Sequence, residues 1–159
     1  MSFSRIAIIG LGKIGLPLAV QIARRRGSVV GVDISAEVVD AINAGRSPIV
    51  GEPQLAERLA TTVASGTFFA TTDLATAVAE SAFVIVVVPL LVDELGIPQF
   101  AGIDSATEDI ANAIQPGTTV IYETTLPVGT TRNRFSTVLA KSSGLNVGSE
   151  IDRKSTRLN

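Results

Sequence analysis

The chain has 159 residues, a net charge of −2 and no cysteine or histidine. These counts exclude disulfides, thiolate zinc sites, cysteine nucleophiles and imidazole acid–base catalysis within it. The apolar fraction of 46% is near the average for soluble domains, and no apolar run approaches the roughly 18 residues of a membrane span. We therefore expect a cytoplasmic protein. The basic residues cluster only at Arg24 to Arg26, so we also expect that it binds neither nucleic acid nor membrane.

The first half of the chain predicts strands at residues 6–9 and 29–33 and helices at residues 16–26 and 36–44. Residues 6–9 are a short, continuous apolar run, which is typical of a strand buried on both faces of a parallel sheet. Gly27 is placed to end the first helix, and Ser35 is placed to cap the second. The order predicts a βαβ unit followed by a further helix.

The second half continues the alternation. It predicts a helix that starts at Pro53, helices at residues 74–80, 104–114 and 130–141, and strands at residues 67–71, 82–88 and 118–122. Asp73 or Thr72 is expected to cap the helix at 74–80, and residues 90–100 are expected to form a loop. Strands and helices that alternate in this way predict an α/β fold, a Rossmann-type doubly wound parallel sheet in a single domain.

A glycine-rich turn joins the first strand to the first helix in the pattern G-x-G-x-x-G. Such glycines allow a tight turn, a close approach by a diphosphate and close helix packing. An acid ends the next predicted strand, 23 residues after the first glycine. There it would accept hydrogen bonds from ribose hydroxyls and repel a 2′-phosphate, which favours NAD over NADP. The predicted cofactor-binding residues here are Gly10, Gly12, Lys13, Ile14, Gly15 and Asp33.

A plainer interpretation of these residues stays open. The glycines can serve only to make a tight strand-to-helix turn, with Asp33 capping the next helix. The Lys13 side chain can lie over the phosphates or be solvated with no role.

Four stretches together resemble a known family: residues 10–19 (GLGKIGLPLA), 45–59 (GRSPIVGEPQLAERL), 86–93 (VVVPLLVD) and 122–132 (YETTLPVGTTR). They are similar to the N-terminal NAD-binding domain of the nucleotide-sugar 6-dehydrogenases, which include UDP-glucose and UDP-N-acetylmannosamine dehydrogenases. The resemblance implies NAD as cofactor, a UDP-sugar as substrate and a homodimeric parent protein. It also implies oxidation of the sugar C6 alcohol to a carboxylate through a thioester on a cysteine in a later domain.

By the resemblance, Thr125 lies beside the nicotinamide and helps to hold a water at the reacting carbon, although a strand-end threonine can also simply bond the backbone. Glu123 belongs to the same catalytic site, or else pairs with a loop amide or faces solvent. Glu52 would lie near the sugar nucleotide, or in a plain helix-leading turn. Pro89 and Leu90 fall where the family commonly has Pro-Thr-Pro, so Leu90 cannot give the cofactor the hydroxyl hydrogen bond of that threonine.

The resemblance predicts one NAD-binding domain over residues 1–151 and a tail over residues 152–159. The tail, DRKSTRLN, is the translation of GAT CGG AAG AGC ACA CGT CTG AAC, a common sequencing adapter, so we expect a non-native tail joined to a truncated gene. A natural polar tail is the alternative. Without the cysteine, the chain alone is expected to be inactive.

Two other functions fit part of the pattern. Another NAD-dependent dehydrogenase, of the 6-phosphogluconate or 3-hydroxyacyl-CoA type, would open with the same glycine turn. A non-catalytic NAD-sensing domain would need the turn and Asp33 but not the segment that contains Glu123 and Thr125.

Overall fold

The predicted apolar runs become strands of a parallel sheet, and a further strand that was not predicted joins its edge. The computed structural model describes residues 4–155. The strands of this sheet are β1 (Ile6–Ile9), β2 (Val29–Val32), β3 (Phe68–Thr71), β4 (Phe83–Val86), β7 (Thr119–Tyr122) and β8 (Asp152–Ser155), and they lie in the order β3-β2-β1-β4-β7-β8. β1 pairs with both β2 and β4, so the strand order reverses between β1 and β4. Doubly wound sheets bind ligands at the carboxyl ends of the strands where the order reverses.

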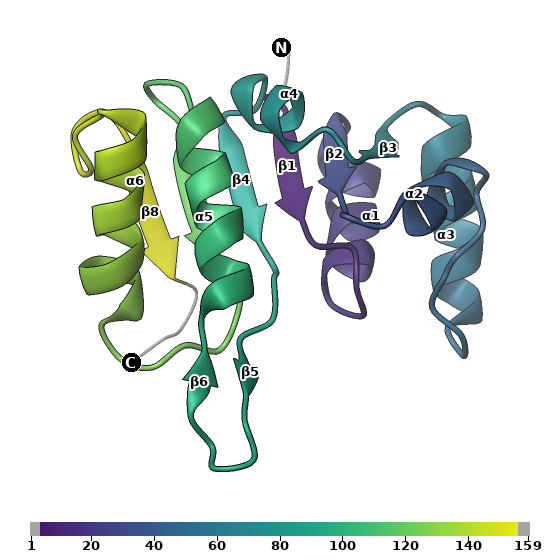
Figure 1. The fold of residues 1–159 in the computed structure, drawn as a ribbon. Helices are drawn as coiled ribbons and strands as arrows, with labels where there is room; N and C mark the ends of the chain where they lie inside the picture. Colours follow the sequence, from purple (N-terminus) through teal and green to yellow (C-terminus); the bar gives the residue numbers. More distant parts are fainter. Residues whose placement is uncertain (1–3, 156–159) are drawn as a thin grey trace.

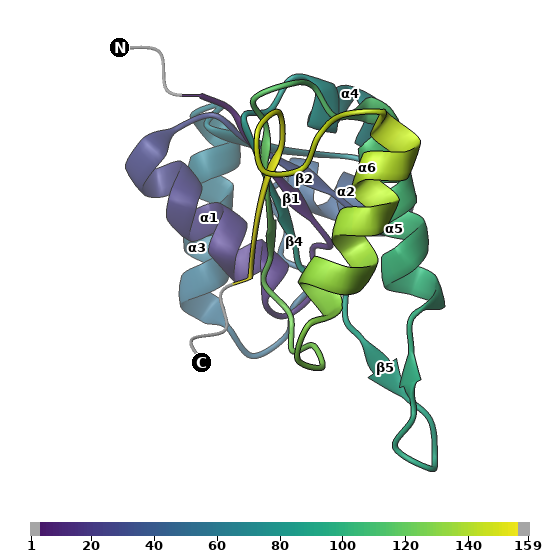
Figure 2. The same ribbon diagram turned by 90° about the vertical axis from the view of Figure 1, so that its left-hand side faces the viewer.

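Helices cover both faces of the sheet (Figures 1 and 2). One face carries α1 (Gly15–Arg26), α2 (Ala36–Asn43) and α3 (Pro53–Ala64), and the other carries α4 (Leu74–Ala79), α5 (Ala101–Ala113) and α6 (Ser136–Ser143). Neighbouring residues of a strand point to opposite faces of the sheet. Ile8 therefore packs in the core beneath α1, α2 and α3, whereas Ala7 and Ile9 pack in the core beneath α4, α5 and α6. None of the helices in residues 4–155 has the length and apolar character needed to traverse a lipid bilayer.

The predicted helix ends are confirmed. The Ser35 hydroxyl accepts a hydrogen bond from the Val38 amide at 3.3 Å and so caps α2. The Asp73 carboxylate accepts one from the Thr76 amide at 3.0 Å and caps α4. Gly27 ends α1 with a φ of 72°, in the left-handed region that glycine reaches without strain.

The prediction that residues 90–100 form a loop is wrong. They form a hairpin of β5 (Leu91–Val92) and β6 (Pro98–Gln99), which projects beyond the carboxyl end of the main sheet (Figure 1). The Asp93 carboxylate stabilises its turn, because it accepts hydrogen bonds from the Leu95 and Ile97 amides at 3.0 and 2.8 Å. Two-residue strands give too short an alternation to be recognised from sequence.

The helix predicted over residues 130–141 is present, but its first part is not an α-helix. Its first part is a π-helix, η1 (Thr131–Phe135), and α6 follows without a break. A π-turn is wider than an α-turn and often marks a functional site.

Residues 152–155 pair in register with β7 as the edge strand β8. The adapter origin expected for residues 152–159 concerns nucleotides and stays a prediction. Residues 156–159 lie outside the described residues.

Candidate functional site

The glycine turn has one glycine that the fold requires and one that leaves space. A Cβ on Gly15 would lie 1.8 Å from the Gly10 carbonyl oxygen, so no larger residue fits there without a backbone shift. A Cβ on Gly12 would have no protein atom within 4 Å. The backbone at Gly12 is therefore open to the close approach of a ligand.

The backbone amides of this turn point to an anionic partner. Within residues 4–155, the amides of Gly12, Lys13 and Ile14 have no acceptor, and α1 has neither a side-chain cap nor an acid in its first turn. Unpaired amides and the positive end of the helix dipole together favour a phosphate group. The predicted residues thus present unpaired amides at an open surface on which an anion can bind.

Asp33 follows β2 and is tied to the same turn. Its Oδ2 accepts a hydrogen bond from the Leu11 amide at 2.9 Å, and its Oδ1 accepts one from the Ser35 amide at 3.0 Å. The helix cap is Ser35, so capping is not the role of Asp33. A carboxylate has about four acceptor positions, so about two of those on Asp33 remain available to a ligand.

The glycine inside β2, Gly31, was not among the predicted site residues. A Cβ on Gly31 would lie 2.7 Å from the Leu11 side chain, which is almost fully buried. Leu11 thus fills the space above Gly31 and holds the glycine turn against the sheet. A glycine inside an apolar strand is the signal for such a close approach.

The second group of predicted residues lies at the ends of β4 and β7. The Glu123 amide donates to the Val86 carbonyl at 2.9 Å, which aligns the two strand ends. The Thr125 side chain is exposed, and its hydroxyl has no hydrogen-bond partner in the described part of the chain, so it does not bond the backbone there. Pro89 is exposed, whereas Leu90 is half-buried and packs against the core.

Tyr122 anchors the end of β7 below these residues. Its ring stacks on Phe135 with the centroids 4.4 Å apart, and its hydroxyl lies 3.1 Å from the Thr107 hydroxyl. Burial raises the pKa of the Tyr122 phenol well above its usual value. The phenol therefore stays neutral and serves packing rather than proton transfer.

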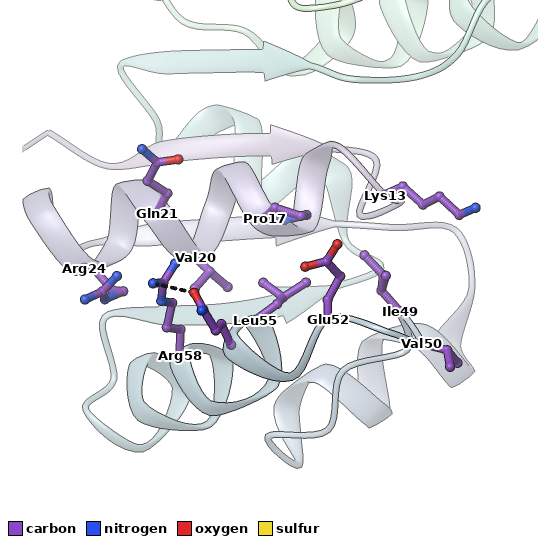
Figure 3. A pocket seen from close by; sticks show the side chains of 11 residues that line it. Lys13, Pro17, Val20, Gln21, Arg24, Ile49, Val50, Glu52, Leu55 and Arg58 are labelled. Atoms are coloured by element: carbon purple, nitrogen blue, oxygen red, sulfur yellow. Dashed lines mark hydrogen bonds between the residues drawn. The ribbon is translucent and has the colours of Figure 1, made fainter.

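A pocket of about 510 Å³ lies between α1 and α3 (Figure 3). It joins Lys13 of the glycine turn to Glu52, which precedes α3, while Arg24 and Arg58 lie at the other end. Neither Asp33 nor Thr125 lines it. The structure thus brings Glu52 to the side of α1 and not to the strand ends that bear Glu123 and Thr125.

Fold and site together define a dinucleotide-binding domain of the Rossmann type. The sequence profile of the UDP-glucose/GDP-mannose dehydrogenase family, NAD binding domain, matches residues 4–155. The chain belongs to this family, and its cofactor is NAD. The family expected from the four stretches, the doubly wound fold and the cofactor are confirmed.

Relatives and solved structures agree with this assignment. The chain is 43% identical over 132 residues to UDP-N-acetyl-D-mannosamine dehydrogenase of Escherichia coli strain K12, a match that covers 82% of the chain and 30% of the relative. It superimposes on GDP-mannose dehydrogenase from Pseudomonas aeruginosa with a TM-score of 0.90 and 31% identity, covering 98% of the chain and 36% of that protein. It superimposes on UDP-D-ManNAc dehydrogenase from Pyrococcus horikoshii with a TM-score of 0.87 and 31% identity, covering 98% of the chain and 37% of that protein. The chain spans about a third of the length of these proteins.

Proposed function

We propose that this chain supplies the NAD site of an enzyme that oxidises the C6 alcohol of a UDP-sugar to a carboxylate. The observation that carries the proposal is the turn at Gly12, where open space, unpaired amides and the Asp33 carboxylate meet. The relatives named above are dehydrogenases of nucleotide sugars, which supports the substrate class.

Each part of the site has a proposed role. The amides of residues 12–14 bind the diphosphate. The Asp33 carboxylate accepts hydrogen bonds from the hydroxyls of the adenosine ribose and repels a 2′-phosphate. NAD, when bound, supplies the hydride acceptor. Thr125 and Glu123 lie at the strand ends, where an unpaired hydroxyl and a carboxylate can hold and orient a water near the sugar carbon.

The chain has no cysteine to carry the thioester that the family's reaction requires. We therefore propose that it binds NAD without turnover. Calorimetry with NAD and NADP, and an absorbance assay for NADH with UDP-N-acetylmannosamine or UDP-glucose, test both statements. We expect NAD to bind more tightly than NADP and no NADH to form. Absence of NAD binding at millimolar concentration by the folded chain would reject the proposed site.

We also propose that residues 152–159 come from adapter sequence. The sequence of β8, DRKS, supports this, because it lacks the apolar residues of β4 (FVIV), which lies elsewhere in the same sheet. Reading the nucleotides tests the idea: codons that differ from those of the adapter would reject it.

A further inference from the structure

Two segments, called walls below, would flank the far half of a dinucleotide bound at the glycine turn, and both begin at neighbouring strands. A dinucleotide bound here would cross the point where the strand order reverses, so with Asp33 after β2 its other half would lie over β4 and β7. Residues 87–100, with the hairpin, lead from β4 to α5. Residues 123–130 lead from β7 to η1. The first wall holds Leu90, and the second holds Thr125.

The ends of these two walls meet at Arg134. Its guanidinium donates from Nε to Asp104 Oδ1 at 2.8 Å and from Nη2 to Asp104 Oδ2 at 2.5 Å. It also lies 4.2 Å from the centroid of the Phe100 ring. Phe100 is the last residue of the first wall, and Asp104 lies in the first turn of α5. Arg134 lies on η1, directly after the second wall.

The geometry at Arg134 is specific to arginine. A bidentate pair with a carboxylate needs the planar guanidinium fork, and the same cation lies over the Phe100 ring. Asp104 in turn raises the pKa of Arg134, in the direction expected for the pair. The contact is half-exposed, with 47% of the Arg134 side chain accessible, so it can form and break without unfolding the core.

The second wall is connected rigidly to η1. Thr130 donates from its amide and its hydroxyl to the Pro127 carbonyl at 3.1 and 2.8 Å, and the Asn133 amide donates to the Gly129 carbonyl at 2.8 Å. Phe135 is fully buried against Tyr122. A shift of η1 relative to Phe100 would therefore change the spacing between the walls.

We propose that Arg134 is a positioning residue: through Asp104 and Phe100 it sets the spacing between the two walls that flank the nicotinamide end of the cofactor site. The inference rests on the proposed NAD site and adds a residue thirty positions from its ion-pair partner. Arg134 touches neither the glycine turn nor Asp33, so its effect is confined to one half of the dinucleotide.

Calorimetry with two ligands tests the proposal, because ADP-ribose contains every part of NAD except the nicotinamide. For Arg134→Ala we expect NAD affinity to fall by up to about fivefold, the effect of a coupling energy at the upper end for an exposed ion pair. The affinity for ADP-ribose is expected to stay unchanged. Arg134→Lys keeps the charge but not the fork, and we expect it to show the same selective loss.

A matched control is available on the same π-helix. Arg132 is exposed, and its guanidinium makes no ion pair or side-chain hydrogen bond within residues 4–155, so Arg132→Ala removes one charge and neither kind of polar contact. Its affinity for both ligands is expected to match that of the wild type. The double variant Asp104→Asn with Arg134→Ala should bind NAD only slightly more weakly than either single variant, because both changes break the same ion pair.

The outcomes separate the two proposals. If the wild type binds neither ligand, the proposed NAD site fails and this inference fails with it. If the wild type binds both, but Arg134→Ala and Arg134→Lys leave NAD affinity unchanged or weaken both ligands equally, the positioning role is overturned while the NAD site stands. Circular dichroism melts confirm which variants are folded, and Arg134→Lys decides the question if the alanine variant unfolds.

Discussion

Alanine substitutions at two glycines of the same turn should have different effects. Gly15→Ala should lower the stability of the fold, whereas Gly12→Ala should weaken NAD binding. At Gly15 the new Cβ would lie 1.8 Å from a backbone oxygen, and neither atom belongs to a flexible side chain that can move aside. Overpacking of this kind costs about 3 kcal/mol, at the upper end of its usual range. For a chain of this size, the loss corresponds to a fall in melting temperature of roughly 6–12 °C.

At Gly12 the new Cβ meets no protein atom, and the backbone is not in the positive-φ region. Gly12→Ala is therefore expected to leave stability unchanged or to raise it by up to about 1 kcal/mol, because the unfolded chain loses freedom. The methyl group instead occupies the space in which the diphosphate approaches the amides. Loss of two charge-assisted hydrogen bonds of about 1.5 kcal/mol each weakens NAD binding about 100-fold.

Thermal unfolding by circular dichroism gives the stability of both variants, and calorimetric titration with NAD gives the affinity. The wild type is the reference in both assays. A stable Gly12→Ala variant that keeps wild-type NAD affinity would refute the assignment of this turn to the diphosphate. A Gly15→Ala variant as stable as the wild type would refute the packing argument.

Three further changes test other parts of the site. Asp33→Asn keeps an acceptor for the Leu11 amide but loses the charge, so NAD affinity should fall about tenfold and the preference over NADP should narrow in competition titrations. Leu90→Thr restores the hydroxyl that the family commonly has, and should raise NAD affinity while lowering the melting temperature, because Leu90 packs against the core; unchanged affinity would remove this position from the site. Tyr122→Phe removes the hydrogen bond to Thr107 and should cost about 1 kcal/mol in denaturant titrations near neutral pH. Burial raises the pKa of the Tyr122 phenol, so its contribution is complete below the unfolded pKa of about 10 and is lost as the pH rises further. Stability should therefore fall more steeply above that pH in the wild type than in Tyr122→Phe, and equal slopes would contradict this.

Local patterns predicted most of the fold. The apolar run at residues 6–9, the glycines after it and the caps at Ser35 and Asp73 depend on neighbours within a few positions, and all formed as expected. The hairpin in residues 90–100 was missed because its strands are two residues long. β8 was missed because backbone pairing with β7, rather than an apolar pattern, makes it a strand.

The candidate site divides in the same way. Gly12 and Gly15 were recognised by spacing alone, but only coordinates separate the glycine that packing requires from the one that leaves space for a ligand. The contact of Arg134 with Asp104 and Phe100 joins residues about thirty positions apart and leaves no motif in the sequence. Contacts at that separation depend on the packing of α5 against α6, which one sequence does not reveal.

The hydrogen bond between Asp33 and the Leu11 amide constrains how this site can evolve. The carboxylate that selects the cofactor also fixes the shape of the loop that binds its phosphates. A lineage that moved toward NADP by replacing the acid with a small apolar residue would loosen the loop in the same step. A route through asparagine limits that loss because its one side-chain oxygen can still accept from the Leu11 amide, and a change in cofactor preference is therefore expected to pass through a polar intermediate at position 33.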